Sequence, residues 1–416
     1  MTNPVHPAEV RDLAGRVGSG MAQSFDSVAS IQSTLTTICQ VQGVDDAVVL
    51  AFPTAVIVQT GEGKQSSVGL QTNFGGSLRY DQIAALYELI GTLKFSRIEP
   101  VEANHRLDEI SSLPPKFPWV MRVIGYSLFA AGFSLILQPT PATVVTCALL
   151  GLLIGAIYLT NWPTLQLVLP AVVSFVVTAI VLVASRQFGL EDPIRILVPV
   201  LVMFLPGAAI TIGVIELASN QMVAGASRLV SGTVTLLLLS FGIIAATAFL
   251  DIPIDAVQDD PAGTIGPWVM VIAIPIYLVG LMLLFCSPWR YFPWMLAILA
   301  LTYLGQLIGG MVFSAQLSGF FGALVMTPLA LWFDRMPQGP SKLITVLPAF
   351  WMIVPGATGL MAIVGIGANG SFGSLTSVIV TVIAIALGVL SGTALFNTVL
   401  KMRRGLSDRH ADSAVS

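Results

Sequence analysis

The stretch PVLVMFLPGA, from Pro199 to Ala208, recurs as PAFWMIVPGA from Pro348 to Ala357. In both copies a proline is followed seven positions later by Pro-Gly-Ala, and the two copies lie 149 positions apart. Proline removes a helical hydrogen bond, so each copy predicts a bend or break in an apolar helix. One copy alone is equally well explained as an ordinary kink of a membrane helix. Two copies in register favour a functional role.

The composition predicts an integral membrane protein. Of 416 residues, 55% are hydrophobic and only 10% are charged, and the mean hydropathy is +0.86. Soluble proteins carry about 25% charged residues. Residues 1–116 nevertheless hold 8 of the 19 Lys and Arg and 12 of the 22 Asp and Glu, which is a soluble composition. We therefore expect an N-terminal soluble domain followed by a membrane part. The first residues contain no apolar core of a cleavable signal peptide, which predicts a cytoplasmic N-terminus.

The soluble domain, residues 1–116, is expected to be α+β. Apolar residues in steps of three and four from Val10 to Val41 predict one long or twice-broken helix that ends near Gly43. Three short β-like runs at 47–50, 55–59 and 67–71 predict a small antiparallel sheet. Two more helices are predicted at 81–93 and 99–110, and the proline-rich segment 113–118 is the joint to the membrane part.

Uncharged intervals predict about ten membrane helices in residues 117–402, since one span needs about 20 apolar residues. The first Pro-Gly-Ala falls in the fourth helix and the second in the ninth. Basic residues gather in the loops on the side of the N-terminus, so the positive-inside rule places both termini in the cytoplasm. Residues 403–416 are expected to form a disordered cytoplasmic tail.

The repeat extends to a second pair of segments at the same spacing. Pro118-Trp119-Val120-Met121 recurs as Pro267-Trp268-Val269-Met270. The membrane part would then consist of two five-helix units, residues 117–266 and 267–402. Five is an odd number, so the units would run in opposite senses across the bilayer. Such an inverted repeat is the architecture of many secondary transporters, whose broken helices expose backbone N–H and C=O groups to the substrate.

Candidate site residues cluster around the two breaks. The predicted substrate-binding residues are Pro206, Gly207, Ala208, Thr211, Pro355, Gly356, Ala357 and Thr358. The two threonines could instead bond back to their own helix backbone. Glu216, Asn220 and Arg228 are candidates for proton coupling or gating, with a solvated inner loop as the alternative. The three cysteines and three histidines show no metal-binding spacing, and no cofactor is expected.

This pattern resembles the threonine/serine exporter family of bacteria and fungi. The resemblance is carried by Pro206-Gly207-Ala208 through Glu216-Leu217 to Gly225-Ala226-Ser227-Arg228, and by Ile353-Val354-Pro355-Gly356-Ala357. Members usually have Gly-Ala followed shortly by Arg-Val-Glu in the first soluble helix, whereas this chain has Gln23 to Ser30 without that motif. The resemblance implies export of small hydroxy amino acids by a proton-driven antiporter in the plasma (inner) membrane.

Two alternatives come from other functional classes. One is a channel or sensor, and the other is a membrane-tethered enzyme with its chemistry in residues 1–116. Ser19 lies in no nucleophile elbow, and Asp45-Asp46 has no accompanying ligand set, so a non-enzyme is expected. The expected partners are a small amino acid and the lipid bilayer, but no nucleic acid, because the net charge is −3. Assembly into a homo-oligomer is a further possibility.

Overall fold

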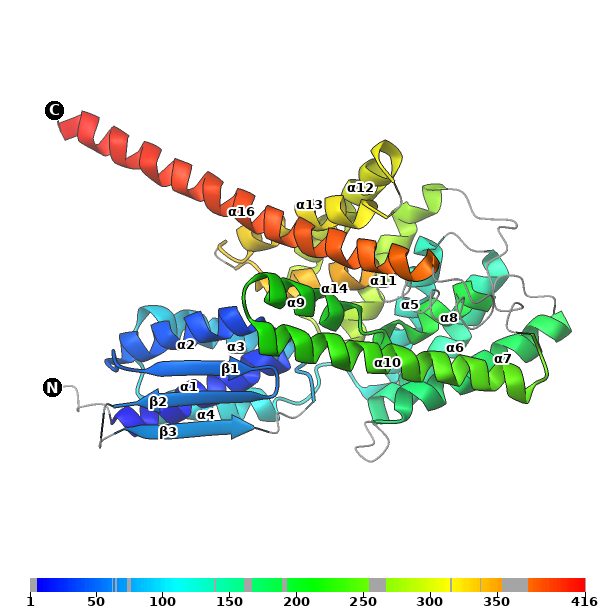
Figure 1. Cartoon of the computed structure of the whole chain (residues 1–416), viewed down its shortest axis with the longest axis horizontal. Helices are drawn as coiled ribbons and strands as arrows, with labels where there is room; N and C mark the ends of the chain where they lie inside the picture. Colours follow the sequence, from blue (N-terminus) through cyan, green and yellow to red (C-terminus); the bar gives the residue numbers. More distant parts are fainter. Residues whose placement is uncertain are drawn as a thin grey trace.

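The computed structural model describes residues 6–61, 63, 66–72, 76–137, 140–160, 167–188, 193–253, 267–314, 316–336, 338–353 and 373–415, and side chains as far as residue 403. About 79% of the described residues are helical. A small three-stranded α+β unit precedes a larger bundle of apolar helices (Figure 1). The N-terminal unit and the C-terminal end of the last helix lie at the same end of the molecule.

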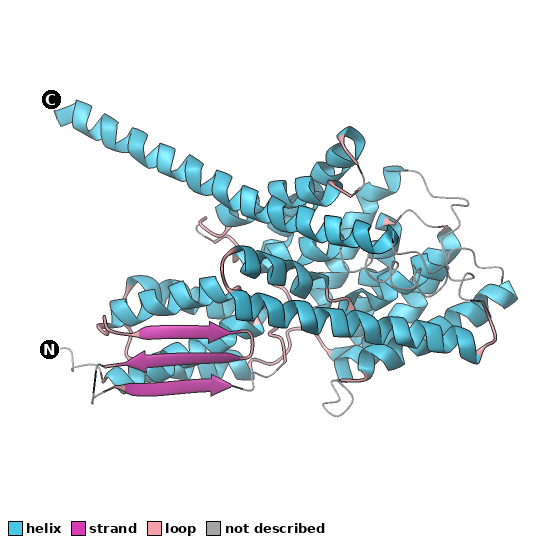
Figure 2. Ribbon diagram, viewed as in Figure 1, coloured by secondary structure: helices cyan, strands magenta, loops and turns pink. Residues whose placement is uncertain are grey.

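The N-terminal unit forms where the hydrophobic patterns predict it. Its elements are α1 (Pro7–Gln23), α2 (Val28–Gln42), β1 (Val48–Phe52), β2 (Ala55–Thr60), β3 (Ser67–Thr72), α3 (Tyr80–Phe95) and α4 (Pro100–Ser112). The three strands are antiparallel in the order β1-β2-β3, with the helices on one face of the sheet (Figure 2). The predicted first helix is broken once, at Ser24–Ser27, and α2 ends at Gly43, whose left-handed φ of 93° suits glycine.

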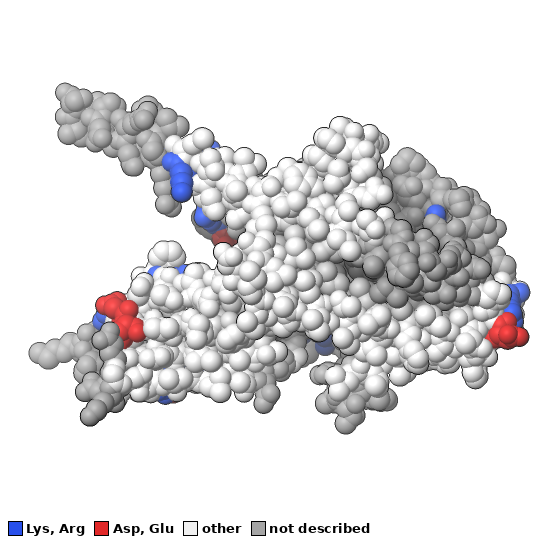
Figure 3. Space-filling model, in the orientation of Figure 1, with Lys and Arg blue, Asp and Glu red and all other residues white. Residues whose placement is uncertain are grey.

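The bundle consists of apolar α-helices and short 3-10 turns. They are α5 (Trp119–Ile136), α6 (Pro141–Thr160), α7 (Leu169–Phe188), α8 (Pro193–Leu201), the 3-10 turn η2 (Val202–Phe204), α9 (Gly207–Ala218), α10 (Met222–Phe249), η4 (Pro267–Val269), α11 (Met270–Leu284), η5 (Trp289–Tyr291), α12 (Phe292–Val312), α13 (Ser318–Phe333), α14 (Lys342–Ile353) and α16 (Gly373–Val415). The exposed surface of the bundle in Figure 3 is almost free of charge between its two ends, as a lipid-facing surface requires.

The number of membrane spans is established only in part. Within the described ranges, six helices are long and apolar enough to cross a membrane, and the bent pair Pro193–Phe204 and Gly207–Ala218 makes a seventh. Three further apolar helices, α11, α13 and α14, are shorter than one span. The protein is therefore a multi-span membrane protein, and the predicted count of ten helices in two units of five is not established.

Helices α5 and α11 form the most extensive helix pair of the bundle and run antiparallel. Going along α5 from Gly125 to Gly132, the partner on α11 goes from Leu284 back to Tyr277. A Cβ atom on Gly132 would lie 2.3 Å from the Tyr277 backbone nitrogen. Glycine is therefore required by the close approach of the two backbones, a common device in membrane helix pairs.

We expect Gly132→Ala to destabilise the protein by about 1–3 kcal/mol, the usual cost of overpacking a tight core. The added methyl group meets backbone atoms, which cannot move without separating α5 from α11. Thermal unfolding of the detergent-purified protein measures the effect. The matched control is Gly91→Ala on α3, where an added Cβ meets nothing within 4 Å. An unfolding midpoint equal to that of the control would contradict the packing argument.

Helices α5 and α11 make equivalent hydrogen bonds to α8 and α14, the helices that contain Pro199 and Pro348. The Tyr126 hydroxyl of α5 donates to the Val200 carbonyl of α8 over 2.8 Å. The Tyr277 hydroxyl of α11 donates to the Pro348 carbonyl of α14, also over 2.8 Å. Each acceptor lies at or beside the first proline of one copy of the repeated stretch. A buried hydroxyl–carbonyl bond therefore ties each stretch to its own α5 or α11 partner.

Candidate functional site

The first Pro-Gly-Ala breaks its helix as predicted. The segments Pro193–Phe204 and Gly207–Ala218 meet at an angle of 61°. The first segment tightens into η2 before Leu205, and α9 begins at Gly207. Pro199 lies inside α8, and the Cys147 thiol lies 3.9 Å from the Arg195 carbonyl, which the proline leaves without its helical partner.

No side chain of the described residues caps the N-terminus of α9. Pro206 occupies the N-cap position, and the first helical hydrogen bond runs from the Ile210 N–H to the Pro206 carbonyl. The N–H groups of Gly207, Ala208 and Ala209 therefore have no partner within the helix, at the positive end of a 12-residue helix. Such an end attracts anions, including carboxylates.

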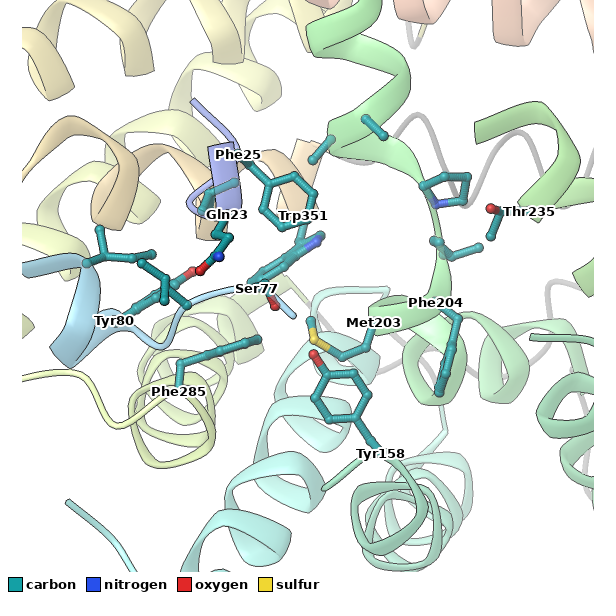
Figure 4. Close-up of a pocket in the computed structure, with 17 residues that line it drawn as sticks. Gln23, Phe25, Ser77, Tyr80, Tyr158, Met203, Phe204, Thr235, Phe285 and Trp351 are labelled. Atoms are coloured by element: carbon teal, nitrogen blue, oxygen red, sulfur yellow. The ribbon is translucent and has the colours of Figure 1, made fainter. Parts of the chain in front are cut away.

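A cavity of about 220 Å³ lies against this break. Pro206, Ala208 and Ala209 form part of its wall, and the remaining walls come from α6, α10, α14 and the segments around Phe285 and Tyr80 (Figure 4). Six of the lining residues are aromatic: Phe25, Tyr80, Tyr158, Phe204, Phe285 and Trp351. No Asp, Glu, Lys or Arg lines the cavity among the residues that the structure describes. A volume below the 300–1,000 Å³ typical of drug-sized ligands suits a small metabolite.

Tyr80 supplies a polar group without a partner in the cavity wall. It is the first residue of α3, is 1% exposed, and its hydroxyl has no hydrogen-bond partner among the described residues. Burial raises the pKa of Tyr80 well above its ordinary value, so the hydroxyl stays protonated and can donate. A buried hydroxyl without a partner costs free energy, which a bound ligand would recover.

An aromatic column joins the N-terminal unit to α14. The Tyr80 ring stacks on Phe285 at 5.0 Å, and Phe285 stacks on Trp351 at 5.6 Å. The Tyr80 N–H also donates to the Phe285 carbonyl over 3.0 Å. Trp351 belongs to the second copy of the repeated stretch, four positions before Pro355 in the sequence, so the cavity touches both copies.

The predicted residues of the second copy lie outside the described residues. These are Pro355, Gly356, Ala357 and Thr358, and α14 is described only as far as Ile353. Their roles stay predictions.

Of the predicted residues of the first copy, Pro206 and Ala208 line the cavity, and Gly207 is the buried first residue of α9. Thr211 is fully buried one turn further along α9 but does not line the cavity. Its hydroxyl has no partner within the described ranges, so the alternative of a bond back to the helix is not observed there.

Glu216 and Arg228 form a buried ion pair at the boundary with the N-terminal unit. The Arg228 Nε donates to Glu216 Oε2 over 3.0 Å, and the two side chains are 9% and 1% exposed, respectively. Glu216 Oε1 accepts the Val28 N–H over 3.1 Å, and Arg228 Nη2 donates to the Asp26 carbonyl over 3.2 Å. The alternative of a solvated loop is therefore wrong for these two residues. The pair holds the α1–α2 turn at the N-terminus of α2.

Asn220 has a different position. It is exposed in the turn between α9 and α10, where its φ of 62° is in the left-handed region that asparagine tolerates. The structure does not bring it together with the ion pair, and it shapes the turn instead.

Comparison with known proteins identifies a family for this chain. A model of the family described as "Putative threonine/serine exporter" (ThrE) matches residues 12–250, more than half of the chain. The chain belongs to this family. The match spans both the N-terminal α+β unit and the first broken helix.

Curated relatives of this ThrE family chain are fungal. It is 31% identical over 159 residues to "Pheromone-regulated membrane protein 10" of Kluyveromyces lactis and 30% identical over 159 residues to the protein of that name in Eremothecium gossypii. It is 28% identical over 158 residues to an uncharacterised protein of Schizosaccharomyces pombe. Each match covers 37% of this chain but only 17%, 21% and 19% of the respective relative. No solved structure matches.

Sequence reasoning missed part of the cavity of this ThrE family chain. Tyr80, Phe285 and Trp351 come from three segments far apart along the chain, and the pattern around each is that of an ordinary buried aromatic residue. No spacing rule connects them, because Phe285 and Trp351 are brought together by packing of the bundle and Tyr80 by docking of the N-terminal unit on it. Within the described part of the chain there is also no group of three metal-ligating side chains.

Proposed function

We propose that this protein is a secondary transporter that exports small amino acids, threonine or serine, from the cytoplasm in exchange for protons. Membership of the exporter family supports transport across a membrane. The cavity at the broken helix is the observation that supports a small amino acid as the substrate. It is small, no charged side chain of the described residues lines it, and no described side chain caps the helix N-terminus in its wall.

The N-terminus of α9 is the proposed site of the substrate carboxylate. Ala208 and Ala209 line the cavity and belong to the first turn, where the N–H groups are available. An anion there gains hydrogen bonds and the favourable end of the helix dipole without an arginine or lysine. Transporters with discontinuous helices hold the carboxylate of their substrate in this way.

The aromatic wall is the proposed site of the substrate ammonium group. Aromatic faces attract cations by about 0.5–2 kcal/mol, and more strongly where water is excluded. Trp351 and Tyr158 line the cavity and are the proposed contacts, since Phe285 is already stacked by Tyr80 and Trp351. We assign the Tyr80 hydroxyl to the side-chain hydroxyl of the substrate, because it is the buried polar group in the wall that lacks a partner among the described residues.

Proton coupling is proposed at the Glu216–Arg228 pair. Glu216 lies on the same helix as the break, and it also touches the α1–α2 turn, whose Phe25 lines the cavity. Phe25 has a left-handed φ of 61°, which is strained for an aromatic residue. Protonation of Glu216 would weaken its bonds to Arg228 and Val28 and so release the turn.

The proposed transport cycle uses two units in opposite orientation. The antiparallel α5–α11 pair and the matched Tyr126 and Tyr277 hydrogen bonds support an inverted repeat. The N-terminal unit and the end of α16 lie at the same end of the molecule, which supports a common side of the membrane for both termini. We propose that this side is the cytoplasm and that the membrane is the plasma membrane. Alternating access would come from movement of one unit against the other.

Reconstituted vesicles test this function. With an imposed pH gradient, we expect saturable, concentrative uptake of labelled threonine or serine that a protonophore abolishes. Parallel vesicles carrying glycine, leucine and lysine define the substrate class. Absence of gradient-dependent flux of any amino acid would contradict the proposal, and non-saturable flux would indicate a channel.

We expect Tyr80→Phe to raise the KM for threonine about 5- to 20-fold with little change in the maximal rate, since one hydrogen bond contributes about 1–2 kcal/mol. The ring stacking on Phe285 is retained, and the lost hydroxyl has no protein partner among the described residues, so the unfolding midpoint should not fall. Alanine, which lacks the hydroxyl, is the matched substrate control and should show no change in KM. An equal change for both substrates would exclude the assigned contact.

A further inference from the structure

A second, larger cavity lies outside the proposed transport site. Its volume is about 730 Å³, and its walls are α3 of the N-terminal unit, the η5 segment and the loop between α13 and α14. It shares no lining residue with the cavity at the broken helix. We refer to it as the α3 cleft.

Three cations from three separate elements line the α3 cleft. They are Lys94 of α3, Arg290 of η5 and Arg335 beyond α13. Among the described residues, none of the three forms an ion pair with a carboxylate, whereas Arg290 stacks on the Tyr291 ring at 4.9 Å and Arg335 on the Phe396 ring at 4.6 Å. Arg290 Nη2 also donates to the Tyr291 hydroxyl over 3.0 Å. The stacking orients both guanidinium groups, and their remaining hydrogen-bond donors can bind an anion.

Two carboxylates also line the cleft and do not cancel this charge. Glu88 is exposed on α3, and Asp334 accepts the backbone N–H of Lys342 over 2.9 Å. Burial, followed by repulsion from Lys342, lowers the pKa of Lys94, whereas the charges of Asp334 and Asp26 raise it. The basic side chains of the cleft outnumber its acidic ones by three to two.

The loop that forms one wall is tightly built. A Cβ atom on Gly339 would lie 1.9 Å from the Phe333 carbonyl oxygen, and Gln338 adopts a left-handed φ of 72°. Ser341 is 8% exposed, and its hydroxyl has no hydrogen-bond partner within the described ranges. An unpartnered buried hydroxyl beside three unpaired cations suits an acceptor-rich anion.

We infer that the α3 cleft binds a phosphate-bearing anion through Lys94, Arg290 and Arg335. Guanidinium groups recognise phosphate with two parallel hydrogen bonds, and lysine adds a point charge. The phosphate could belong to the head group of an anionic phospholipid or to a soluble phosphorylated compound. Arg335 also lines an adjoining apolar groove of about 530 Å³ with Leu329, Trp332 and Phe396, which offers a path for acyl chains.

Such an anion would bridge the N-terminal unit and the bundle, because Lys94 belongs to the former and Arg290 and Arg335 to the latter. Occupancy would then stabilise their contact. This site is independent of the proposed transport function, since the two cavities share no lining residue.

Two binding measurements on the full-length protein distinguish the sources of phosphate. In the first, delipidated protein in detergent receives phosphatidylglycerol or phosphatidylcholine, and bound lipid is counted by native mass spectrometry. In the second, protein in phosphatidylcholine nanodiscs is titrated calorimetrically with inorganic pyrophosphate. We expect binding in at least one of the two measurements, preferential for phosphatidylglycerol in the first or saturable in the second.

The test variant combines Lys94→Gln with Arg290→Gln. We expect at least fivefold weaker binding than in the wild type. The matched control combines Arg106→Gln with Lys116→Gln, which removes two exposed positive charges of residues 1–116 away from the cleft and should bind within twofold of the wild type. If the test variant does not fold, Arg335→Gln alone is used with the same criterion. No binding in either measurement, or equal weakening by the control, overturns the inference.

Discussion

Replacing Gly207 by leucine is expected to reduce threonine flux to less than a tenth of the wild-type rate. Gly207 begins α9 immediately after the 61° break, is buried, and lies between two residues of the cavity wall, Pro206 and Ala208. A leucine side chain at this point would compete with the substrate carboxylate for the N-terminus of the helix. Initial rates of labelled threonine uptake into vesicles with an imposed pH gradient measure the effect.

The control for this prediction is Gly310→Leu in α12. There an added Cβ meets only the Ser318 Cβ at 3.6 Å, an ordinary contact, so leucine should fit. Both variants must reach the membrane and elute as single peaks, so that folding is not the variable. Wild-type flux in Gly207→Leu would show that the helix break at Pro206 and Gly207 has no role in transport. If the second copy of the repeat has an equivalent role, Gly356→Leu is also expected to reduce threonine flux to less than a tenth of the wild-type rate.

The second large effect is expected for Arg228→Met. Removing the arginine leaves Glu216 buried without its cation, and breaking a buried ion pair in this way costs about 3–5 kcal/mol. The Asp26 carbonyl also loses the donor from Arg228 Nη2. We expect a marked fall in the thermal unfolding midpoint of the purified protein and faster proteolytic release of the N-terminal unit.

The double variant Glu216→Gln with Arg228→Met separates charge from packing. Glutamine still accepts the Val28 N–H, and no unpaired charge remains, so the double variant should be more stable than Arg228→Met alone. If the pair also couples protons, Glu216→Gln should retain threonine exchange but lose the response to a pH gradient. A double variant as unstable as Arg228→Met would show that charge is not the cause.

The sequence alone was sufficient to predict features that depend on neighbouring residues. The periodicity from Val10 to Val41 predicted one long or twice-broken helix where the structure has two, and the alternating runs predicted the three strands within a few residues. The break at Pro206 followed from the chemistry of proline, which cannot donate the helical hydrogen bond. The membrane character followed from composition.

The functional interpretation of Glu216 and Arg228 needed tertiary structure. The sequence shows two charges twelve positions apart near a loop, and their burial depends on the α1–α2 turn, nearly 190 residues earlier in the chain. The number of membrane helices also remained open, since α11, α13 and α14 are shorter than a span by their own length and composition.

By itself, the sequence predicted the three strands, the helical stretches of the N-terminal unit, the membrane character and the site of the helix break. These properties depend on the residue and its near neighbours, through hydrogen bonding and hydrophobic periodicity. The tertiary structure decided which side chains form the cavity, because Phe285 and Trp351 meet through packing within the bundle and Tyr80 joins them only when the N-terminal unit docks on it. Long-range packing of this kind leaves no periodic signal in the chain.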